Sequence, residues 1–269
     1  MAVQTLYTAA SGVDSLQTKL DVIANNLANV NTTSFKKARC NFEDLYYVQE
    51  RLPGSRDASG NLTPTGIAVG LGTRVESTQT DFSQGPFQQT NSQLDVAIEG
   101  QGFFQVLDPT GTIFYTRAGN FSVNNQGQFV VGSAYTGRLV QPQISIPPDT
   151  TGIVISPDGQ VSVRQPNQPN LQTVGQLQLA NFVNPEGLLK MGENLYSQTE
   201  ASGPPNIANP GTLGTGLGVL RQSALEASNV EPVVELIDLI TTQRAFELNS
   251  QVIQAGDQIL QLIANLRRF

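Results

Sequence analysis

The 269-residue chain contains no histidine, no tryptophan and a single cysteine, Cys40. Without imidazole there is no Ser-His-Asp or Cys-His nucleophile system, and the usual zinc sites are excluded as well. One cysteine cannot form an internal disulfide bond. The missing residue types therefore argue against an enzyme, and we expect no catalytic residue, no metal site and no cofactor.

Charged side chains are also scarce, at 14% of the residues, whereas an average globular protein has roughly 25%. The formal net charge of −7 disfavours binding to nucleic acid or to an anionic membrane surface. No stretch approaches about 18 consecutive apolar residues, so we expect no membrane insertion. The N-terminus lacks the basic region and the continuous apolar run of a cleavable secretory signal.

The N-terminal end of the chain carries a regular apolar repeat. Between Leu6 and Val30 the apolar residues recur at alternating steps of three and four. This heptad pattern is typical of a helix that packs along a partner helix rather than on a globular core. We expect a helix from about residue 5 to residue 30, with an assembly seam formed by Leu6, Val13, Leu16, Leu20, Ile23, Leu27 and Val30.

A second repeat of this kind lies at the C-terminal end, with one extra four-residue step near Thr241. We expect this row to pair with the N-terminal helix through a seam that includes Ile237, Leu248, Val252, Ile259 and Leu262. The same helix has another apolar row, formed by Phe246, Ile253, Leu260 and Ile263. Because so broad an apolar surface must be covered on several sides, we expect other copies of the chain to cover this second row.

The sequence between the two helices predicts β structure. Short apolar runs there are separated by turns with Gly, as at residues 124–127 and 157–159. The fold class we expect is α+β, with paired terminal coiled-coil helices, an inserted and mostly antiparallel β domain, and an extended, irregular linking region. The predicted domains are a helical domain of residues 1–30 and 231–269, a linking domain of residues 31–92 and 209–230, and a β-rich outer domain of residues 93–208.

Residues 48–72 form a long stretch with few apolar residues within the linking domain. Successive turn signals make most of it irregular in our prediction. At its end Ile67, Val69 and Leu71 alternate with other residues as in a strand, and a strand needs an edge to pair with. We expect that edge to belong to a neighbouring subunit.

Four asparagines crowd the end of the first helix, at Asn25, Asn26, Asn29 and Asn31. Asparagine is a poor interior helix former because its amide competes for backbone groups. Two interpretations are equally compatible with this cluster. It is either a frayed helix end, or a polar lock, that is, a set of hydrogen bonds to a neighbouring helix or subunit. The residues alone leave both interpretations open.

Two further features invite a functional interpretation. The Gly-rich residues 70–72 and 214–218 do not open a helix after a buried strand, as a phosphate-binding loop must, so we expect close-packed extended backbone there. Asp95 and Glu99 offer an enzyme hypothesis, a carboxylate-based hydrolase. Four residues apart on a strand, they are more simply a solvated edge.

Several segments together resemble bacterial flagellar rod and hook proteins. These are residues 24–37, 94–106, 115–121, and 228–230 with 241–247, and they bracket nearly the whole chain. The family typically has Gly where this chain has Ser34. The insertion at residues 48–72 resembles the one that marks distal rod members. The motif residues that carry the resemblance are Asn25, Asn26, Asn29, Asn31, Gly100, Gly102, Phe103, Gln243 and Arg244.

The resemblance implies a structural subunit of the flagellar distal rod that self-assembles into a rigid helical tube and transmits torque from motor to hook. The implied partners are copies of the chain, proximal rod proteins below, the hook protein above, the surrounding P- and L-ring proteins and the flagellar export apparatus. It also implies type III export without a cleavable signal peptide, to a rod that crosses the periplasm. The alternatives are a proximal rod or short hook protein of the same family and a secreted β-rich binding module.

Overall fold

The computed structural model describes residues 2–54, 65–133, 137–166 and 170–266. The chain forms two compact units. The helical unit comprises residues 1–28, 38–80 and 231–269, and the β unit comprises residues 29–37 and 81–230. The chain therefore passes from one unit to the other after residues 28, 37, 80 and 230.

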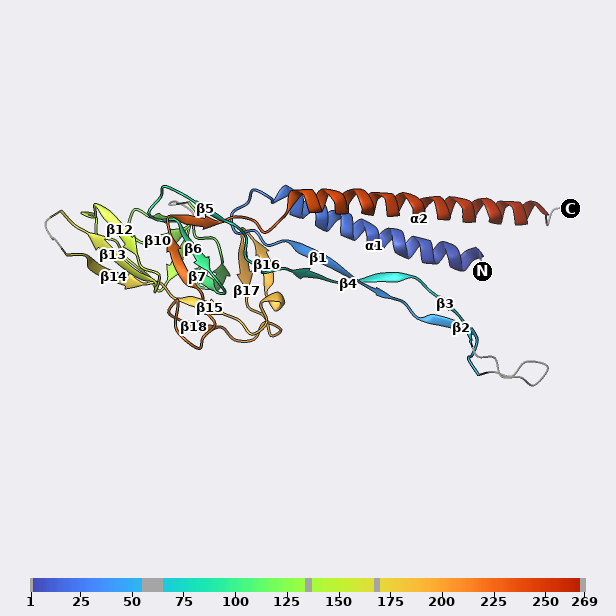
Figure 1. Ribbon diagram of the computed structural model, residues 1–269, viewed down its shortest axis with the longest axis horizontal. Coiled ribbons are helices and arrows are strands. Elements are labelled where there is room, and N and C mark those ends of the chain that lie inside the picture. The colour runs from blue at the N-terminus through green and yellow to red at the C-terminus, as the bar shows by residue number, and fades with distance from the viewer. Residues whose placement is uncertain (1, 55–64, 134–136, 167–169, 267–269) are drawn as a thin grey trace. The chain divides into compact units, whose positions relative to one another are not determined.

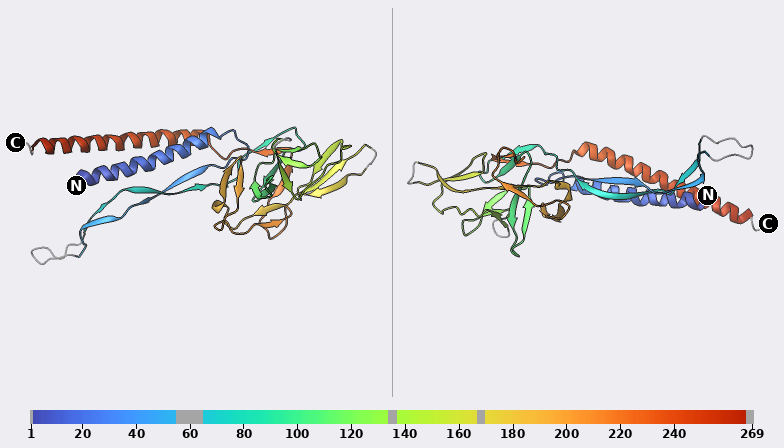
Figure 2. Two further views of the ribbon diagram at one scale, coloured as in Figure 1. Left: turned by 180° about the vertical axis from the view of Figure 1, so that it is seen from behind. Right: turned by 90° about the horizontal axis from the view of Figure 1, so that it is seen from below.

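The helical unit contains two long helices, α1 (Ala2–Ala28) and α2 (Pro232–Leu266), which run antiparallel and side by side (Figures 1 and 2). Their closest approach uses glycine. A Cβ atom at Gly256 would stand 2.8 Å from the Leu6 side chain, and one at Gly12 would stand 3.3 Å from Asn249. The prediction of two long terminal helices in an α+β fold is confirmed.

Burial along α2 identifies the face that lies against α1. The less exposed positions recur at steps of three and four residues and include Glu235, Leu239, Thr242, Phe246, Asn249, Ile253, Gly256 and Leu260. The predicted seam lies on another face of α2 and is 43–64% exposed at Ile237, Leu248, Val252, Ile259 and Leu262.

The expected pairing of that seam with α1 is therefore wrong. The row against α1 is largely the one that we expected other copies to cover, namely Phe246, Ile253 and Leu260, while Ile263 is 53% exposed. A hydrophobic repeat does not reveal this row because its remaining positions are small or polar, including Gly256, Thr242 and Glu235. On α1, by contrast, the predicted seam is buried at Ile23 and half-buried at Leu6, Val13, Leu16, Leu20 and Leu27, and Val30 follows the helix.

Two β ribbons complete the helical unit. Strand β1 (Ala38–Asp44) pairs antiparallel with β4 (Thr73–Thr80), and both strands contact α1. Strand β2 (Tyr47–Arg51) pairs antiparallel with β3 (Ile67–Gly70). The linking region is thus more regular than expected.

The structure changes the interpretation of the insertion. Of its alternating residues, Ile67 and Val69 lie in a strand, β3, and Leu71 follows it. The partner of β3 is β2 of the same chain, where a strand of a neighbouring subunit was expected. The sequence conceals β2 because Tyr47–Arg51 is polar at most positions and exposed throughout. Residues 55–64 of the insertion lie outside the described residues.

The β unit contains a nine-stranded sheet. Its main path is β16 (Leu189–Gly192), β17 (Leu195–Ser197), β8 (Ile113–Thr116), β7 (Phe103–Leu107), β11 (Arg138–Gln141), β10 (Phe129–Val131) and β9 (Phe121–Val123). Strand β15 (Leu179–Asn181) pairs with β7 and with β18 (Asn206–Ala208). The short 3-10 helix η1 (Pro185–Gly187) precedes β16.

Smaller sheets surround this one. Strands β12 (Gly152–Ile155), β13 (Gln160–Arg164) and β14 (Gln172–Gln176) form a three-stranded sheet. Strand β6 (Val96–Glu99) pairs with β19 (Val219–Gln222), and β5 (Phe87–Gln89) pairs with β20 (Ala224–Glu226). All these strand pairs are antiparallel, although β5, β19 and β20 lie in the segments that we expected to form the linking region.

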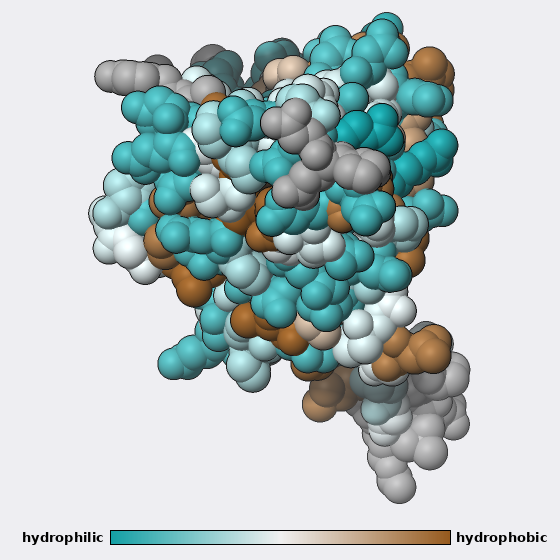
Figure 3. Space-filling view, turned by 90° about the vertical axis from the view of Figure 1, so that its left-hand side faces the viewer, coloured by the Kyte–Doolittle hydropathy of each residue, from teal (hydrophilic) through white to brown (hydrophobic). Residues whose placement is uncertain are grey.

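Two apolar clusters form the core of the β unit. The larger one gathers buried residues of several sheets, among them Ile98, Phe104, Val140, Val161 and Leu179. The smaller one is aromatic, and Phe103 meets Phe182 and Tyr196 edge-to-face there. On the end of the unit formed by β12–β14, Figure 3 shows hydrophobic residues in small patches among hydrophilic ones.

The free edge of β12 is capped by glutamine side chains. The Ile153 amide donates to Gln93 Oε1 at 3.0 Å and the Ile155 amide donates to Gln222 Oε1 at 3.1 Å. The Gln222 amide group in turn donates to the Ile153 carbonyl at 2.9 Å. These side chains occupy the hydrogen-bonding groups that a further strand would need.

Candidate assembly surface and buried charge cluster

The outward face of α2 is an apolar surface without cover in the isolated chain. In addition to the five predicted seam residues, exposed apolar side chains on this helix include Val233, Val234, Leu236, Ile240 and Ile263. A contiguous exposed apolar surface of this kind marks an interaction site, since leaving it in water is unfavourable. We call it the α2 outer face.

The four asparagines of the motif occupy different environments. Asn25 and Asn31 are exposed, and the Asn29 side-chain oxygen accepts a hydrogen bond from the Thr32 hydroxyl at 3.1 Å. Asn26 is 2% exposed and bonds to Ala38 and Glu235. The sequence left two interpretations open, a frayed helix end and a polar lock. For Asn26 the structure supports the polar lock, and its partners belong to the same chain.

The glycine motif marks a crossing of two backbone segments. Gly100 and Gly102 have φ values of 112° and 132°, which favour glycine. A Cβ atom at Gly100 would stand 2.9 Å from the Cα atom of Gly218, and the Gly218 amide donates to the Gln101 carbonyl at 2.8 Å. The expectation of close-packed backbone in residues 214–218 holds at Gly218, whereas a Cβ atom at Gly214 would meet no atom within 4 Å. Phe103 follows directly and enters the aromatic cluster.

The remaining motif residues, Gln243 and Arg244, lie exposed on α2. Arg244 is 3.4 Å from Glu247 one turn later, with both side chains largely in solvent. An exposed pair of this kind contributes little to stability. These two side chains are free to meet another molecule.

A buried charge cluster lies inside the β unit. Lys36 Nζ is 2.5 Å from Glu226 Oε1, and Arg117 Nε is 2.9 Å from Glu226 Oε2. The side chains of Lys36 and Glu226 are fully buried, and that of Arg117 is 3% exposed. Arg117 also donates to the carbonyls of Gly102 and Gly100, at 3.1 and 3.0 Å. The cluster thus holds the glycine crossing in place.

Burial shifts the pKa of Lys36. Loss of water around the ammonium group, with the positive charge of Arg117 close by, lowers the pKa of Lys36 to about 8, although Glu226 and Asp81 act in the opposite direction. Removing Glu226 would leave two cations buried without their carboxylate, which is strongly unfavourable.

The cluster also joins the places where the chain enters and leaves the β unit. The Ser34 amide donates to the Glu226 carbonyl at 2.8 Å, and the Lys37 amide donates to Asn229 Oδ1 at 2.8 Å. Asn229 Nδ2 donates to the Asp81 carbonyl at 2.9 Å. Segments far apart in the sequence are therefore fastened to one another inside the unit.

Sequence reasoning did not select Lys36, Arg117 or Glu226, although the first two lie within family-like segments. The scarcity of charged residues could have identified them. In a chain with 14% charged residues, a single charged side chain within a short β segment is expected to be buried with a partner of opposite charge.

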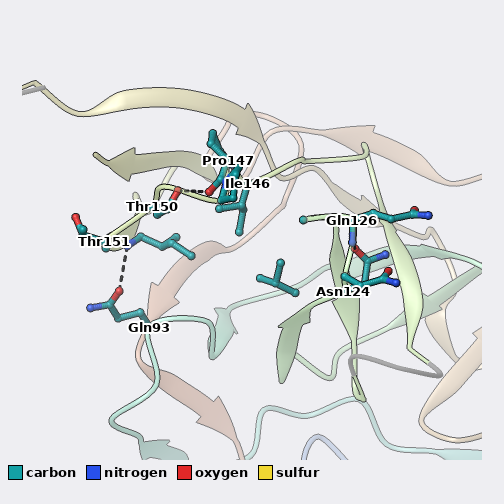
Figure 4. Close-up of a pocket in the computed structure, with 13 residues that line it drawn as sticks. Gln93, Asn124, Gln126, Ile146, Pro147, Thr150 and Thr151 are labelled. Carbon is teal, nitrogen blue, oxygen red and sulfur yellow. Dashed lines mark hydrogen bonds between the residues drawn. The ribbon is translucent and has the colours of Figure 1, made fainter. Parts of the chain in front are cut away.

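A hollow of about 550 Å³ on the β unit does not have the character of a ligand site (Figure 4). Several of its polar side chains already bond to the chain itself. Thr150 Oγ1 donates to the Pro147 carbonyl at 2.7 Å, Asn124 Oδ1 accepts from the Gln126 amide at 3.0 Å, and Gln93 caps β12. Asp95 precedes β6 and Glu99 is its last residue, so a rise of four strand residues places their Cα atoms about 13 Å apart, which is too far for a glycosidase-type pair.

Comparison with known proteins gives the same family along the whole chain. Family models match at residues 6–36 (flagella basal body rod protein), 97–163 (flagellar hook protein FlgE/F/G D1 domain) and 221–266 (flagellar basal body rod FlgEFG protein C-terminal). The chain is 49% identical to the flagellar basal-body rod protein FlgG of Caulobacter vibrioides, over 98% of this chain and 99% of that protein. It is 47% identical to FlgG of Buchnera aphidicola subsp. Baizongia pistaciae, over 98% of this chain and 100% of that protein.

The chain belongs to the FlgG family of flagellar basal-body rod proteins.

The FlgG relatives confirm the family predicted from the motifs, and with it a structural subunit of the flagellar distal rod. They favour this assignment over the proximal rod, short hook and secreted-module alternatives. Among solved structures, the Helicobacter pylori flagellar hook protein FlgE2 aligns at 14% identity and a TM-score of 0.24, over 71% of this chain and 43% of that one, which is too low a similarity to support conclusions. Within the described residues, no helix is long and apolar enough to span a membrane.

Proposed function

We propose that copies of this FlgG-family chain assemble into a rigid helical tube, the distal rod, which transmits torque from the flagellar motor to the hook. The observation that supports this proposal is the α2 outer face. A helix covered by α1 on one side and apolar on another side needs a second helix, and identical copies supply one through a repeating contact.

The mechanism is mechanical. In the proposed tube the terminal helices of neighbouring copies pack side by side, and the seam residues Ile237, Leu248, Val252, Ile259 and Leu262 become buried between them. The exposed apolar residues of the β2–β3 ribbon, including Tyr47, Val48 and Ile67, add a second contact between copies. A subunit held through several separate contacts resists bending and twisting more than one held by a single seam.

The proposed partners follow from this position in the rod. Proximal rod proteins adjoin one end of the tube and the hook protein adjoins the other, while P- and L-ring proteins surround it where it crosses the periplasm. The chain reaches the growing tip through the flagellar type III export apparatus. Family membership in the basal-body rod supports these assignments.

The test is a single charge on the α2 outer face. Leu248 is 63% exposed, so Leu248→Asp has little effect within the isolated chain. In the proposed tube the carboxylate is buried without a partner, which is a large penalty. We expect Leu248→Asp to raise the protein concentration needed for tube formation at least about tenfold, measured by sedimentation and electron microscopy, with an unchanged far-UV circular dichroism spectrum.

Gln254→Asp is the matched control, because it adds the same charge to the same helix at an exposed polar position. We expect this variant to assemble nearly as the parent does. Equal assembly of the parent and Leu248→Asp would show that the α2 outer face does not join copies.

A further inference from the structure

We propose that Asn26 is a positioning residue that couples the helix pair to the β1–β4 ribbon, so that the helical unit becomes ordered as one body. This inference concerns contacts within a single chain. Its consequence for the tube rests on the proposed function, whereas the coupling itself does not.

Asn26 connects three elements with one side chain. Its oxygen accepts a hydrogen bond from the Ala38 amide at 3.0 Å, and its Nδ2 atom donates to the Ala38 carbonyl at 2.8 Å. The same Nδ2 atom donates to Glu235 Oε2 at 3.3 Å. Ala38 is the first residue of β1, and Glu235 lies in the first turn of α2. We call this arrangement the Asn26 junction.

The junction is buried, so water cannot replace its hydrogen bonds if they are lost. Asn26 is 2% exposed and Glu235 is 7% exposed. A primary amide presents an acceptor and a donor side by side, as a backbone peptide does, and Asn26 therefore extends the β1 hydrogen-bonding pattern onto α1. Aspartate lacks the donor and leucine lacks both groups. Leaving the Ala38 groups without partners in this setting is unfavourable.

A second contact fastens the other end of the ribbon to the same helix. Ser15 Oγ donates to the Thr73 carbonyl at 3.4 Å, and the Thr73 amide donates to Ser11 Oγ at 3.3 Å. Gly72 makes this approach possible, since its φ is 121° and a Cβ atom there would stand 2.1 Å from Ser11 Oγ. Ser15 and Asn26 are eleven residues apart, which is about 16 Å along a helix.

Two polar contacts at this separation fix both the position and the direction of the ribbon on α1. The β2–β3 ribbon begins immediately beyond the second contact, where the Leu45 amide donates to the Gly72 carbonyl at 2.9 Å. The Asn26 junction also requires α2 to be in place, because Glu235 is one of its members. Order in the helix pair and order in the ribbon therefore depend on each other.

Hydrogen exchange on the full-length, unassembled chain tests the coupling. The variants are Asn26→Asp, Glu235→Gln and the double variant, and Asn25→Asp is the control because Asn25 is exposed and adjacent. We expect Asn26→Asp to raise exchange about tenfold or more at Ala38 and also along β1 and β4, because the carboxylate cannot donate and it repels Glu235.

We expect Glu235→Gln alone to change little, since the new amide still accepts from Asn26. In the double variant the amide at position 235 donates to the carboxylate at position 26, so exchange in the ribbon recovers at least in part. A double variant that exchanges as fast as Asn26→Asp would overturn the proposal, as would faster exchange confined to residues 24–28.

A pair of substitutions at the second contact keeps the test independent of Asn26. Ser11→Val adds bulk against Gly72, whereas Ala10→Val adds the same bulk at an exposed position of α1. We expect faster exchange at Thr73 and along β1 in Ser11→Val only, and equal exchange in both variants contradicts the docking. We expect Leu248→Asp to impair tube formation without changing exchange in the ribbon, so the experiments distinguish a failure of tube assembly from a failure of the coupling.

Discussion

Lys36, Arg117 and Glu226 place two positive charges and one negative charge in the interior of the β unit. Such a cluster is weak evidence for stability, because removing charges from water is expensive even when they are paired. Its value lies in specificity: Glu226 accepts bonds from Lys36, from Arg117 and, at 3.0 Å, from the Gly85 amide. The carboxylate thereby fixes which segments meet where the chain enters this unit.

The shifted pKa of Lys36 predicts an unusual pH dependence. The folded value is about 8 and the ordinary value is 10.5, so between these limits the unfolded chain binds more protons than the folded chain. Proton uptake on unfolding means that the contribution of Lys36 to the free energy of unfolding rises with pH in this range. We expect a gain of about 1 kcal/mol between pH 7.5 and pH 9.0.

Lys36→Met removes this contribution while leaving the Arg117–Glu226 pair in place. Urea unfolding at several pH values, followed by near-UV circular dichroism of the β unit, measures the difference between parent and variant. Parallel pH profiles for the two proteins would mean that Lys36 retains its ordinary pKa in the fold.

At the scale of elements, the β2–β3 ribbon carries apolar residues that its own chain does not cover. Val48 pairs across the ribbon with Val69 and is 45% exposed. The neighbouring Gln49 points to the other face of the ribbon, since side chains alternate along a strand. The two faces of β2 therefore give a matched pair of positions.

We expect Val48→Asp to leave the stability of the isolated chain within about 1 kcal/mol of the parent value, because little packing is lost. Tubes assembled from this variant are expected to be curved or fragile in electron micrographs, since the charge opposes burial against a neighbouring copy. Gln49→Asp should give straight tubes. Straight tubes of unchanged stiffness from Val48→Asp would show that the ribbon does not contribute a contact between copies.

The sequence predicts the helices well and their contact faces poorly. The heptad repeat from Leu6 to Leu27 locates α1 and its covered side because every position in it is apolar. On α2 the covered row includes Glu235, Thr242 and Gly256, so a purely hydrophobic criterion selects the uncovered row instead. Such polar and small members are recognisable only when their partners, such as Asn26 and Leu6, are known.

The candidate sites divide in the same way. Gly100, Gly102 and Phe103 stand out in the sequence through their resemblance to the family motif, and the structure adds the positive φ of both glycines and the burial of the ring. The Lys36 cluster does not stand out, since its members are 190 and 109 positions from Glu226 in the chain and nothing local pairs them. Long-range polar pairing of this kind depends on the sheet topology, which a single sequence does not reveal.

For the whole molecule, the division into two units predicts two separate unfolding transitions. The helical unit leaves the α2 outer face in water, and its α1–α2 interface contains polar and small residues. The β unit has two apolar clusters and the buried charges. We expect the helical signal at 222 nm to be lost on heating before the near-UV signal of the buried Tyr115 and Tyr196.

The first of these transitions is expected to move to higher temperature as protein concentration rises, because association stabilises the helices by mass action. The second should be nearly independent of concentration. Coincident transitions at all concentrations would mean that the units unfold as one body.

The glutamine caps on β12 have a consequence for how the chain polymerises. Any protein that collects in large numbers in a confined space can join its copies in two ways, by its intended contacts or by indiscriminate strand addition, which leads to amyloid-like fibres. Gln93 and Gln222 occupy the β12 edge with groups of the chain itself, and so remove that edge from the second route. In the proposed tube, copies then join through the helices rather than through this edge.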